Sequence, residues 1–215
     1  MNKRRIGLVM MLVGILAALA GLALGGYNLW DDKRAGEEAE SVLVEFARHR
    51  EAIVTTPGPE PEPDETPAPT PEPDREMPVF ELDGYRYIGT VSIPAIELEL
   101  PVQEDWSLQL LKLTPCRYKG TVYREDLIIC AHNYATHFGR LKNLLPGDEV
   151  LFTDVEGSEY RYTVTLLEDL AGTAVEEMES GEWDLTLFTC TLGGRTRVTV
   201  RCTLAESAGT QSVSP

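Results

Sequence analysis

Positive charge and histidine are both scarce in this sequence. Lysine and arginine together number 19 against 35 aspartates and glutamates, which gives a formal net charge of −16 over 215 residues. Proteins that bind nucleic acids need a basic surface to neutralise the phosphates, so the composition argues against a nucleic-acid partner. The chain has three histidines and four cysteines, so few residues can supply imidazole or thiol chemistry.

Long uncharged apolar runs are lacking except at the N-terminus. Ile6 to Gly26 is a run of 21 residues without a charge, and as a helix it rises about 30 Å, the thickness of the hydrocarbon core of a bilayer. Three cations precede the run and two aspartates follow it, which predicts a cytoplasmic N-terminus and an extracellular remainder. Residues 1–30 are therefore predicted to be a single-pass transmembrane anchor. A cleaved signal peptide is the alternative, since Ala18-Leu19-Ala20 resembles a cleavage site inside the run.

Two segments that cannot form a core of their own follow the anchor. Residues 31–54 have apolar side chains near helical spacing, which predicts a juxtamembrane amphipathic helix. We expect this helix to be a stalk, with a partner-binding helix as the alternative. Residues 55–78 contain nine prolines and seven carboxylates, so they are predicted to form an extended spacer that lifts the next domain off the membrane. The apolar positions of the helix are Ala39, Val42, Leu43, Phe46 and Ile53.

Short β-prone runs separated by polar turns make up residues 79–207. Only residues 106–112 and 137–144 suit helices, and both would be short. Many short strands at regular spacing are typical of an all-β domain, either a closed barrel or a sandwich. Residues 208–215 are predicted to be a flexible tail.

One cysteine lies beside a turn and close to two arginines. Cys190 ends a β-prone run, two glycines follow, and Arg197 opens the next run, with Arg195 as a second candidate. His132 ends another strand-like run, and His137 lies five residues later. A thiolate can attack a carbonyl while an imidazole transfers protons and a guanidinium stabilises the oxyanion. A neighbouring cation also lowers the pKa of a thiol, so this pattern indicates a nucleophilic cysteine.

The residues around this cysteine resemble the sortases, the cysteine transpeptidases of Gram-positive surfaces. TLFTC at 186–190 matches their TLxTC signature, and AHN at 131–133 and RVTV at 197–200 are similar to the segments that carry their histidine and arginine. The resemblance covers residues 85–204. It implies an all-β fold, the closed eight-stranded sortase barrel with short helices, preceded by the transmembrane helix. The subclass that it suggests is class D-like or unassigned.

The resemblance also implies a reaction and roles for four residues. Cys190 would be the nucleophile, His132 the general acid and base, and Arg197 the group that stabilises the oxyanion, while Thr189 would help to shape the substrate site. Members of the family cleave an LPXTG-like signal between Thr and Gly through a thioacyl-enzyme. The expected partners are surface proteins with such a C-terminal signal, a peptidoglycan precursor or other amine as acceptor, and the membrane. No cofactor or metal is expected.

Other interpretations of the same residues stay open at this point. The domain could be a non-catalytic, membrane-tethered module that binds peptides or cell wall. Extracellular cysteines often form disulfides, although we expect Cys130 to be reduced and packed, because a bridge to Cys190 would remove the nucleophile. Cys130, His132 and His137 are close enough in sequence to suggest zinc, but structural zinc sites usually use paired ligands from both ends. Residues 176–179 carry three glutamates that suggest calcium, and a solvated acidic turn is the simpler interpretation.

Overall fold

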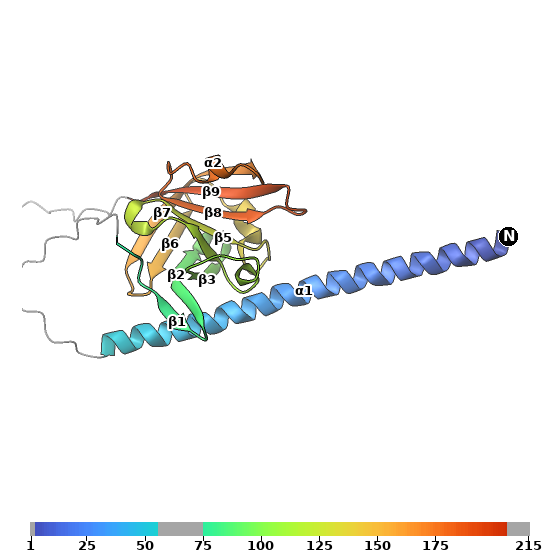
Figure 1. Ribbon diagram of the computed structural model, residues 1–215, viewed down its shortest axis with the longest axis horizontal. Helices are drawn as coiled ribbons and strands as arrows, with labels where there is room; N and C mark the ends of the chain where they lie inside the picture. Colours follow the sequence, from blue (N-terminus) through green and yellow to red (C-terminus); the bar gives the residue numbers. More distant parts are fainter. Residues whose placement is uncertain (1–2, 56–74, 206–215) are drawn as a thin grey trace, which may run out of the picture.

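The computed structural model describes residues 3–55 and 75–205, in which one long helix lies against a β-barrel (Figure 1). Most of the predicted spacer and the whole predicted tail lie outside the described residues. The helix α1 (Lys3–Thr55) is continuous. The predicted anchor and the predicted juxtamembrane helix are therefore parts of a single element.

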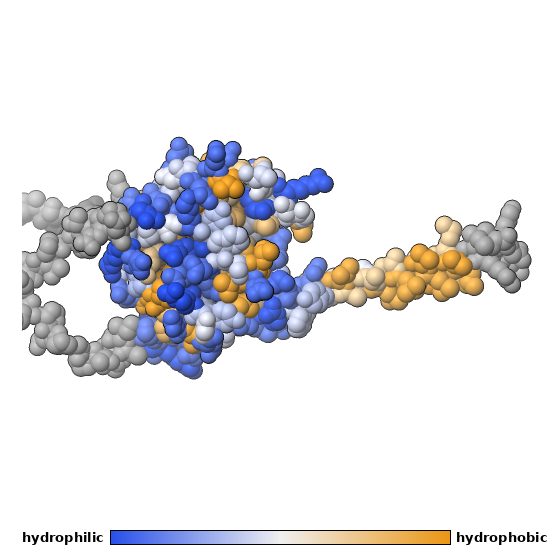
Figure 2. Space-filling view, in the orientation of Figure 1, coloured by the Kyte–Doolittle hydropathy of each residue, from blue (hydrophilic) through white to orange (hydrophobic). Residues whose placement is uncertain are grey.

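The N-terminal part of α1 is apolar and stands clear of the barrel. Within the described residues, α1 is the one helix long and apolar enough to cross a membrane, and its apolar window is not buried against protein. Figure 2 shows this apolar part extending beyond the mainly polar surface of the domain. Such a surface is unfavourable in water, which is why α1 is a candidate membrane span.

Eight strands close into a barrel, as the sequence predicted. The ring order is β2-β3-β4-β5-β8-β9-β7-β6, and β6 pairs back onto β2 to close it. A ninth strand, β1, pairs antiparallel with the start of β2. The strands are β1 (Phe80–Leu82), β2 (Tyr85–Ile93), β3 (Leu98–Gln103), β4 (Cys116–Lys119), β5 (Leu127–Ala131), β6 (Glu149–Asp154), β7 (Glu159–Ala171), β8 (Leu185–Cys190) and β9 (Thr196–Leu204).

A glycine lets β2 change partners and close the ring. The start of β2 pairs with β1, and from Gly89 onward the same edge pairs with β6. Gly89 has φ +156°, and a Cβ at this position would lie 2.2 Å from the carbonyl oxygen of Thr153. Only glycine tolerates this approach of two backbones. Inside the ring, side chains such as Ile88, Val91 and Leu187 are fully buried and form one continuous core.

The connections between strands contain only short helical turns. These are η1 (Pro94–Ile96), η2 (Leu110–Lys112), η3 (Val122–Arg124), η4 (Phe138–Asn143) and the four-residue α2 (Val175–Met178). The two segments predicted as short helices are occupied by η2 and η4, both of them 3-10 helices. The sequence did not indicate η1, η3 or α2, because turns of three or four residues are too short to show a helical period.

The second half of α1, the segment expected to be a juxtamembrane stalk, packs along the barrel. Ala35, Ala39, Val42 and Phe46 form a buried stripe at helical spacing. The ring of Phe46 packs edge-on against Phe80 and Tyr87, with centroids 5.2 and 5.8 Å away. Since α1 reaches the barrel before the spacer begins, the helix sets the distance between the barrel and the candidate span.

Candidate active site

The pairing of three strands brings the predicted site residues to one end of the barrel. β5 and β8 run parallel, and Ala131 pairs with Thr189. The next residues along these strands, His132 and Cys190, therefore follow side by side. β8 and β9 run antiparallel, and this register pairs Cys190 with Arg197. His132 and Cys190 are 58 positions apart in sequence, and the backbone hydrogen bonds between the strands determine where each of them lies.

Cys190 differs from the other three cysteines in its exposure. All four are free thiols; Cys190 is exposed, whereas Cys116, Cys130 and Cys202 are buried. Burial raises the pKa of the Cys116 and Cys202 thiols to about 12 and raises the pKa of Cys130 as well. A thiol must ionise to act as a nucleophile, so the buried three are packing residues.

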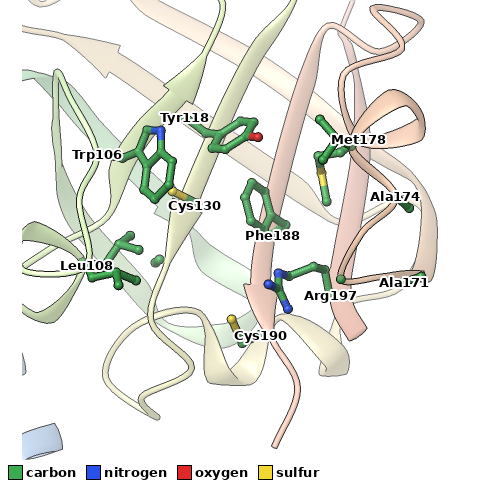
Figure 3. Close-up of a pocket in the computed structure, with 14 residues that line it drawn as sticks. Trp106, Leu108, Tyr118, Cys130, Ala171, Ala174, Met178, Phe188, Cys190 and Arg197 are labelled. Atoms are coloured by element: carbon green, nitrogen blue, oxygen red, sulfur yellow. The ribbon is translucent and has the colours of Figure 1, made fainter. Parts of the chain in front are cut away.

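Arg197 and Cys190 line the same cavity. Nη1 of Arg197 donates to the carbonyl oxygens of Gly194 and Thr196, at 3.0 and 3.2 Å. These bonds fix the side chain at the start of β9, and Figure 3 shows the guanidinium directed toward the side of the cavity where Cys190 lies. The alternative arginine, Arg195, is exposed in the turn between β8 and β9 and does not line this cavity.

His132 lies at the end of β5, stacked on an aromatic ring. Its centroid is 3.9 Å from that of Tyr134, with the two planes 14° apart. Burial lowers the pKa of His132, while the Asp31 carboxylate, the Asn133 side chain and Asp32 act in the opposite direction. The imidazole is therefore neutral over more of the pH range than a free histidine.

His137, the alternative histidine, belongs to the interior. Its side chain is fully buried beside Tyr134. Burial lowers the pKa of His137 to about 4, so it is neutral at physiological pH. No group of three metal-ligating side chains occurs among the residues that the structure describes, which include Cys130, His132 and the glutamates of 176–179. Of those glutamates, Glu179 instead pairs with Lys119.

The cavity beside Cys190 is apolar and has a volume of about 240 Å³. Its aromatic wall is formed by Trp106, Tyr118 and Phe188, whose neighbouring rings lie 5.3 to 5.6 Å apart (Figure 3). The opposite wall is residues 171–178, the segment between β7 and β8 that includes α2. Such a cavity suits an extended peptide with apolar side chains next to the reacting carbonyl. This lining was not predicted from the sequence, although Phe188 could have been found because it alternates with Cys190 along β8.

Two buried residues, Thr189 and Arg201, form hydrogen bonds that stabilise the elements around the cavity. Thr189 is buried, and its hydroxyl donates to the carbonyl oxygen of Ala131 at 2.9 Å, which ties β8 to β5 just before the site. Arg201 is 2% exposed and holds the wall opposite the aromatic rings. It donates to the carbonyl oxygens of Glu177 and Met178, to the Thr186 hydroxyl and to the Glu168 carboxylate.

Comparison with known proteins places this arrangement in a family. A model of the sortase domain matches residues 91–205, more than half of the chain. Sortase A of Bacillus anthracis is 27% identical over 201 residues, which cover 88% of this chain and 89% of that protein.

Solved sortases share the fold. Sortase C of Streptococcus pneumoniae superposes with a TM-score of 0.52 at 22% identity over 82% of this chain and 95% of its own. Sortase C1 of Streptococcus agalactiae gives 0.51 at 23% identity, covering 59% and 72%. A Clostridium perfringens sortase C gives 0.50 at 22% identity, covering 56% and 71%. With an exposed cysteine, a strand-end histidine and a neighbouring arginine on this barrel, the chain belongs to the sortase family of cysteine transpeptidases.

Proposed function

We propose that the protein is a membrane-anchored sortase that cleaves an LPXTG-like sorting signal between Thr and Gly and transfers the surface protein to a cell-wall amine. The observation that carries this proposal is the strand register. It pairs Cys190 with Arg197 beside an apolar cavity, and His132 directly follows Ala131, the partner of Thr189. The cavity can take the Leu-Pro part of such a signal. The Clostridium perfringens sortase C was solved with the C-terminal cell wall sorting motif, which supports a sorting signal as the substrate.

Acylation uses all three residues. The Cys190 thiolate attacks the carbonyl carbon of the signal's Thr, and a C–S bond forms while the carbonyl oxygen takes the negative charge. The Arg197 guanidinium stabilises this oxyanion, since it is fixed through Nη1 and its other N–H groups can face the substrate. As the intermediate collapses, the bond to the Gly nitrogen breaks and the imidazolium of His132 protonates the leaving amine.

Transfer reverses these steps with another amine. The acceptor amine attacks the thioester, and neutral His132 takes the proton that the amine loses. The C–S bond breaks, the Cys190 thiolate leaves, and a new amide joins the surface protein to the acceptor. Thiolate and imidazolium are both restored, so each cycle begins from the same protonation state.

The reaction needs a particular protonation state, with Cys190 as thiolate and His132 as imidazolium. Burial lowers the pKa of His132, so less imidazolium is present at neutral pH than for a free histidine. Because a base and an acid are both required, we expect a bell-shaped pH profile. A rate that keeps rising with pH and never falls would show that no acid is required.

The placement in the cell follows from α1. The apolar part of α1 spans the membrane, with the cations of residues 3–5 on the cytoplasmic side and the barrel outside. Secreted substrates and an acceptor at the outer membrane surface then meet the enzyme in one layer, which raises their effective concentration.

The test uses the full-length protein in detergent with a panel of LPXTG-like peptides and a glycine-based amine, with products identified by mass spectrometry. Cleavage after Thr with amine adducts is expected for the natural protein and not for Cys190→Ala. Arg197→Ala is expected to lose roughly 100-fold or more in kcat, as removal of an oxyanion donor does. Arg195→Ala is the matched control, an exposed arginine outside the cavity, and should keep nearly full activity.

The same panel separates the alternatives. Cleavage without adducts would indicate a hydrolase or an acceptor of another kind. Peptide binding that persists in Cys190→Ala, with no cleavage by the natural protein, would indicate a binding module. Equal losses for the two arginine variants would contradict the assignment of Arg197.

A further inference from the structure

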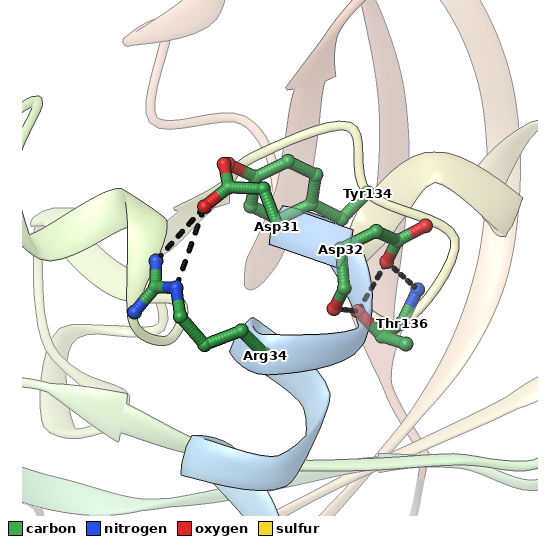
Figure 4. Close-up of polar contacts among 5 residues, drawn as sticks. All are labelled: Asp31, Asp32, Arg34, Tyr134 and Thr136. Carbon is green, nitrogen blue, oxygen red and sulfur yellow. Dashed lines mark hydrogen bonds and ion pairs between the residues drawn. The ribbon is translucent and has the colours of Figure 1, made fainter. Parts of the chain in front are cut away.

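The first turn after the candidate span holds the loop that follows His132. Asp32 accepts a hydrogen bond from the backbone N–H group of Ala135 at 3.1 Å. It accepts another from the backbone N–H group of Thr136 at 3.0 Å (Figure 4). The Thr136 hydroxyl also donates to the backbone carbonyl oxygen of Asp32, at 2.9 Å. Residues 133–137, which we call the histidine loop, are thus bonded to a helix about 100 positions earlier in the chain.

A second contact reaches the ring of the catalytic histidine itself. The Tyr134 hydroxyl donates to the Asp31 carboxylate, and Arg34 holds the same carboxylate from the other side at 3.1 Å (Figure 4). Tyr134 in turn stacks on His132 with the rings 3.9 Å apart. Two links therefore connect α1 to His132.

Small residues allow the helix to come this close. Ala35 is fully buried, and a Cβ placed on Gly36 would meet the Thr136 methyl group at 2.9 Å. A larger side chain at either position would push α1 away from the histidine loop. Small residues and hydrogen bonds occur at the same place, which indicates a specific contact between α1 and the histidine loop.

We propose that Asp31 and Tyr134 are positioning residues for His132, so that the anchor helix also forms part of the active site. Asp31 orients the Tyr134 ring through its hydroxyl, and the ring fixes the plane of the imidazole beside Cys190. The proposal rests on the proposed catalytic role of His132. It assigns to α1 a task beyond membrane attachment.

Asp31 influences His132 in two ways, through its charge and through the hydrogen bond that it accepts from Tyr134. Asp31 is the strongest influence that raises the pKa of His132, against burial and Lys112, which lower it. Removing this charge lowers the pKa of His132 further, so less imidazolium is present at neutral pH. Because the active state needs the imidazolium, each unit by which the pKa of His132 falls reduces the active fraction at neutral pH about tenfold. The charged or titratable groups that act on the ring or on its stacked partner are Asp31, Asp32 and Arg34 of α1, Lys112 of η2, and Tyr134 and His137 of the loop. Cys190 and Arg197 pair with each other on the neighbouring strands β8 and β9.

The test compares Asp31→Asn, Tyr134→Phe and Asp31→Glu in the full-length protein in detergent micelles. Titration of the His132 imidazole is followed by NMR of its carbon-bound protons, assigned with His132→Gln. We expect a lower His132 pKa in Asp31→Asn, a fall in kcat/KM that matches that decrease, and recovery in Asp31→Glu. Tyr134→Phe keeps the stacked ring but loses the hydrogen bond, so we expect kcat to fall about tenfold with little change in KM.

Glu40→Gln is the matched control, since Glu40 is an exposed carboxylate of the same helix, and it should behave as the natural protein. The proposal is overturned if His132 titrates at the same pH in Asp31→Asn and in Glu40→Gln. It is also overturned if Tyr134→Phe leaves kcat unchanged in an active enzyme. If no peptide is transferred even by the natural protein, the proposed function fails, and the NMR titration alone still decides whether Asp31 acts on His132.

Discussion

Burial divides the four cysteines into two kinds, a division that alternation along a strand could not show. Cys130 shares a strand face with His132 and therefore looked like a possible partner of Cys190. In the structure Cys130 is 3% exposed, and burial raises its pKa, so it stays protonated. Cys190 is exposed at the end of β8, because the strand leaves the core one residue after Thr189.

We expect only Cys190 to react with iodoacetamide in the native protein at pH 7.5. The reason is that Cys116, Cys130 and Cys202 are both inaccessible and held in the thiol form. Mass spectrometry of the labelled peptides measures this, with the protein in denaturant as the control in which all four cysteines react. Labelling of Cys130 at the rate of Cys190 would contradict the assignment.

His137 makes folding stability depend on pH in a defined window. Its folded pKa is about 4 because of burial, against about 6.5 in the unfolded chain. Above pH 6.5 both states are neutral and stability is complete. As the pH falls from 6.5 to 4, the unfolded chain takes up a proton that the folded state does not, and stability decreases by up to roughly 3 kcal/mol.

Chemical denaturation between pH 7 and pH 4 measures this decrease. In His137→Phe the slope with pH should become shallower, whatever the absolute stability of the variant. Some slope should remain, because burial lowers the pKa of His132 too. Identical slopes for the natural protein and the variant would show that His137 does not drive the effect.

At the scale of elements, local patterns predicted the strands of the site but not what covers them. Alternation placed Cys190 and Arg197 at the ends of adjacent runs, and the barrel and its closure were confirmed. The stripe that contains Phe46 was visible in the sequence, yet periodicity says only that one face is apolar. Its partners Phe80 and Tyr87 come from β1 and β2, across a spacer whose sequence gives no pairing information.

The wall of the cavity formed by residues 171–178 depends on one buried arginine. Arg201 is on β9, four residues after Arg197, so alternation along the strand puts both residues on one face. The sequence could not show that its guanidinium binds carbonyl oxygens of Glu177 and Met178 in a separate segment. Glu177 and Met178 precede β8 and Arg201 follows it, so these contacts form only when the segments on both sides of β8 are folded together.

We expect Arg201→Met to raise KM for the peptide more than it lowers kcat. Methionine fills much of the space but leaves the Glu168 carboxylate and two carbonyl oxygens without their donor, so the wall loosens while Cys190 and Arg197 stay on their strands. Stability should fall by about 3 kcal/mol, since Arg201 is buried and its removal leaves a partly buried carboxylate and buried carbonyl oxygens without a donor. Steady-state kinetics and denaturation measure the two effects.

Arg161→Met is the control for this prediction, because Arg161 pairs with Glu149 and Glu159 at the surface. Surface pairs contribute little, so stability should change by less than about 1 kcal/mol and KM should not change. A loss of kcat at constant KM in Arg201→Met would mean that Arg201 supports the reacting residues rather than the wall.

For the whole molecule, α1 is both the candidate span and a packed part of the catalytic domain. Its apolar part ends where Asp31 and Asp32 bind the histidine loop, so the active-site end of the barrel is the end nearest to the proposed membrane (Figure 1). The helix fixes that distance, whereas the sequence had suggested a proline-rich spacer for this purpose. Composition predicted a helix after the apolar run, but it could not show that this helix folds against the domain that follows the spacer.

We therefore expect the spacer to be replaceable and the helix junction not to be. In vesicles with a lipid-tethered amine acceptor, exchange of residues 56–74 for a Gly/Ser sequence of equal length should leave transfer unchanged, because α1 holds the barrel in place. Insertion of a ten-residue Gly/Ser segment between Trp30 and Asp31 keeps the contact of Asp31 with the histidine loop. It also makes the distance between the barrel and the membrane variable. Transfer to the tethered acceptor should then fall several-fold, while transfer to a soluble amine stays the same. If instead the spacer exchange reduces only the tethered reaction, the spacer and not the helix sets the position of the active site.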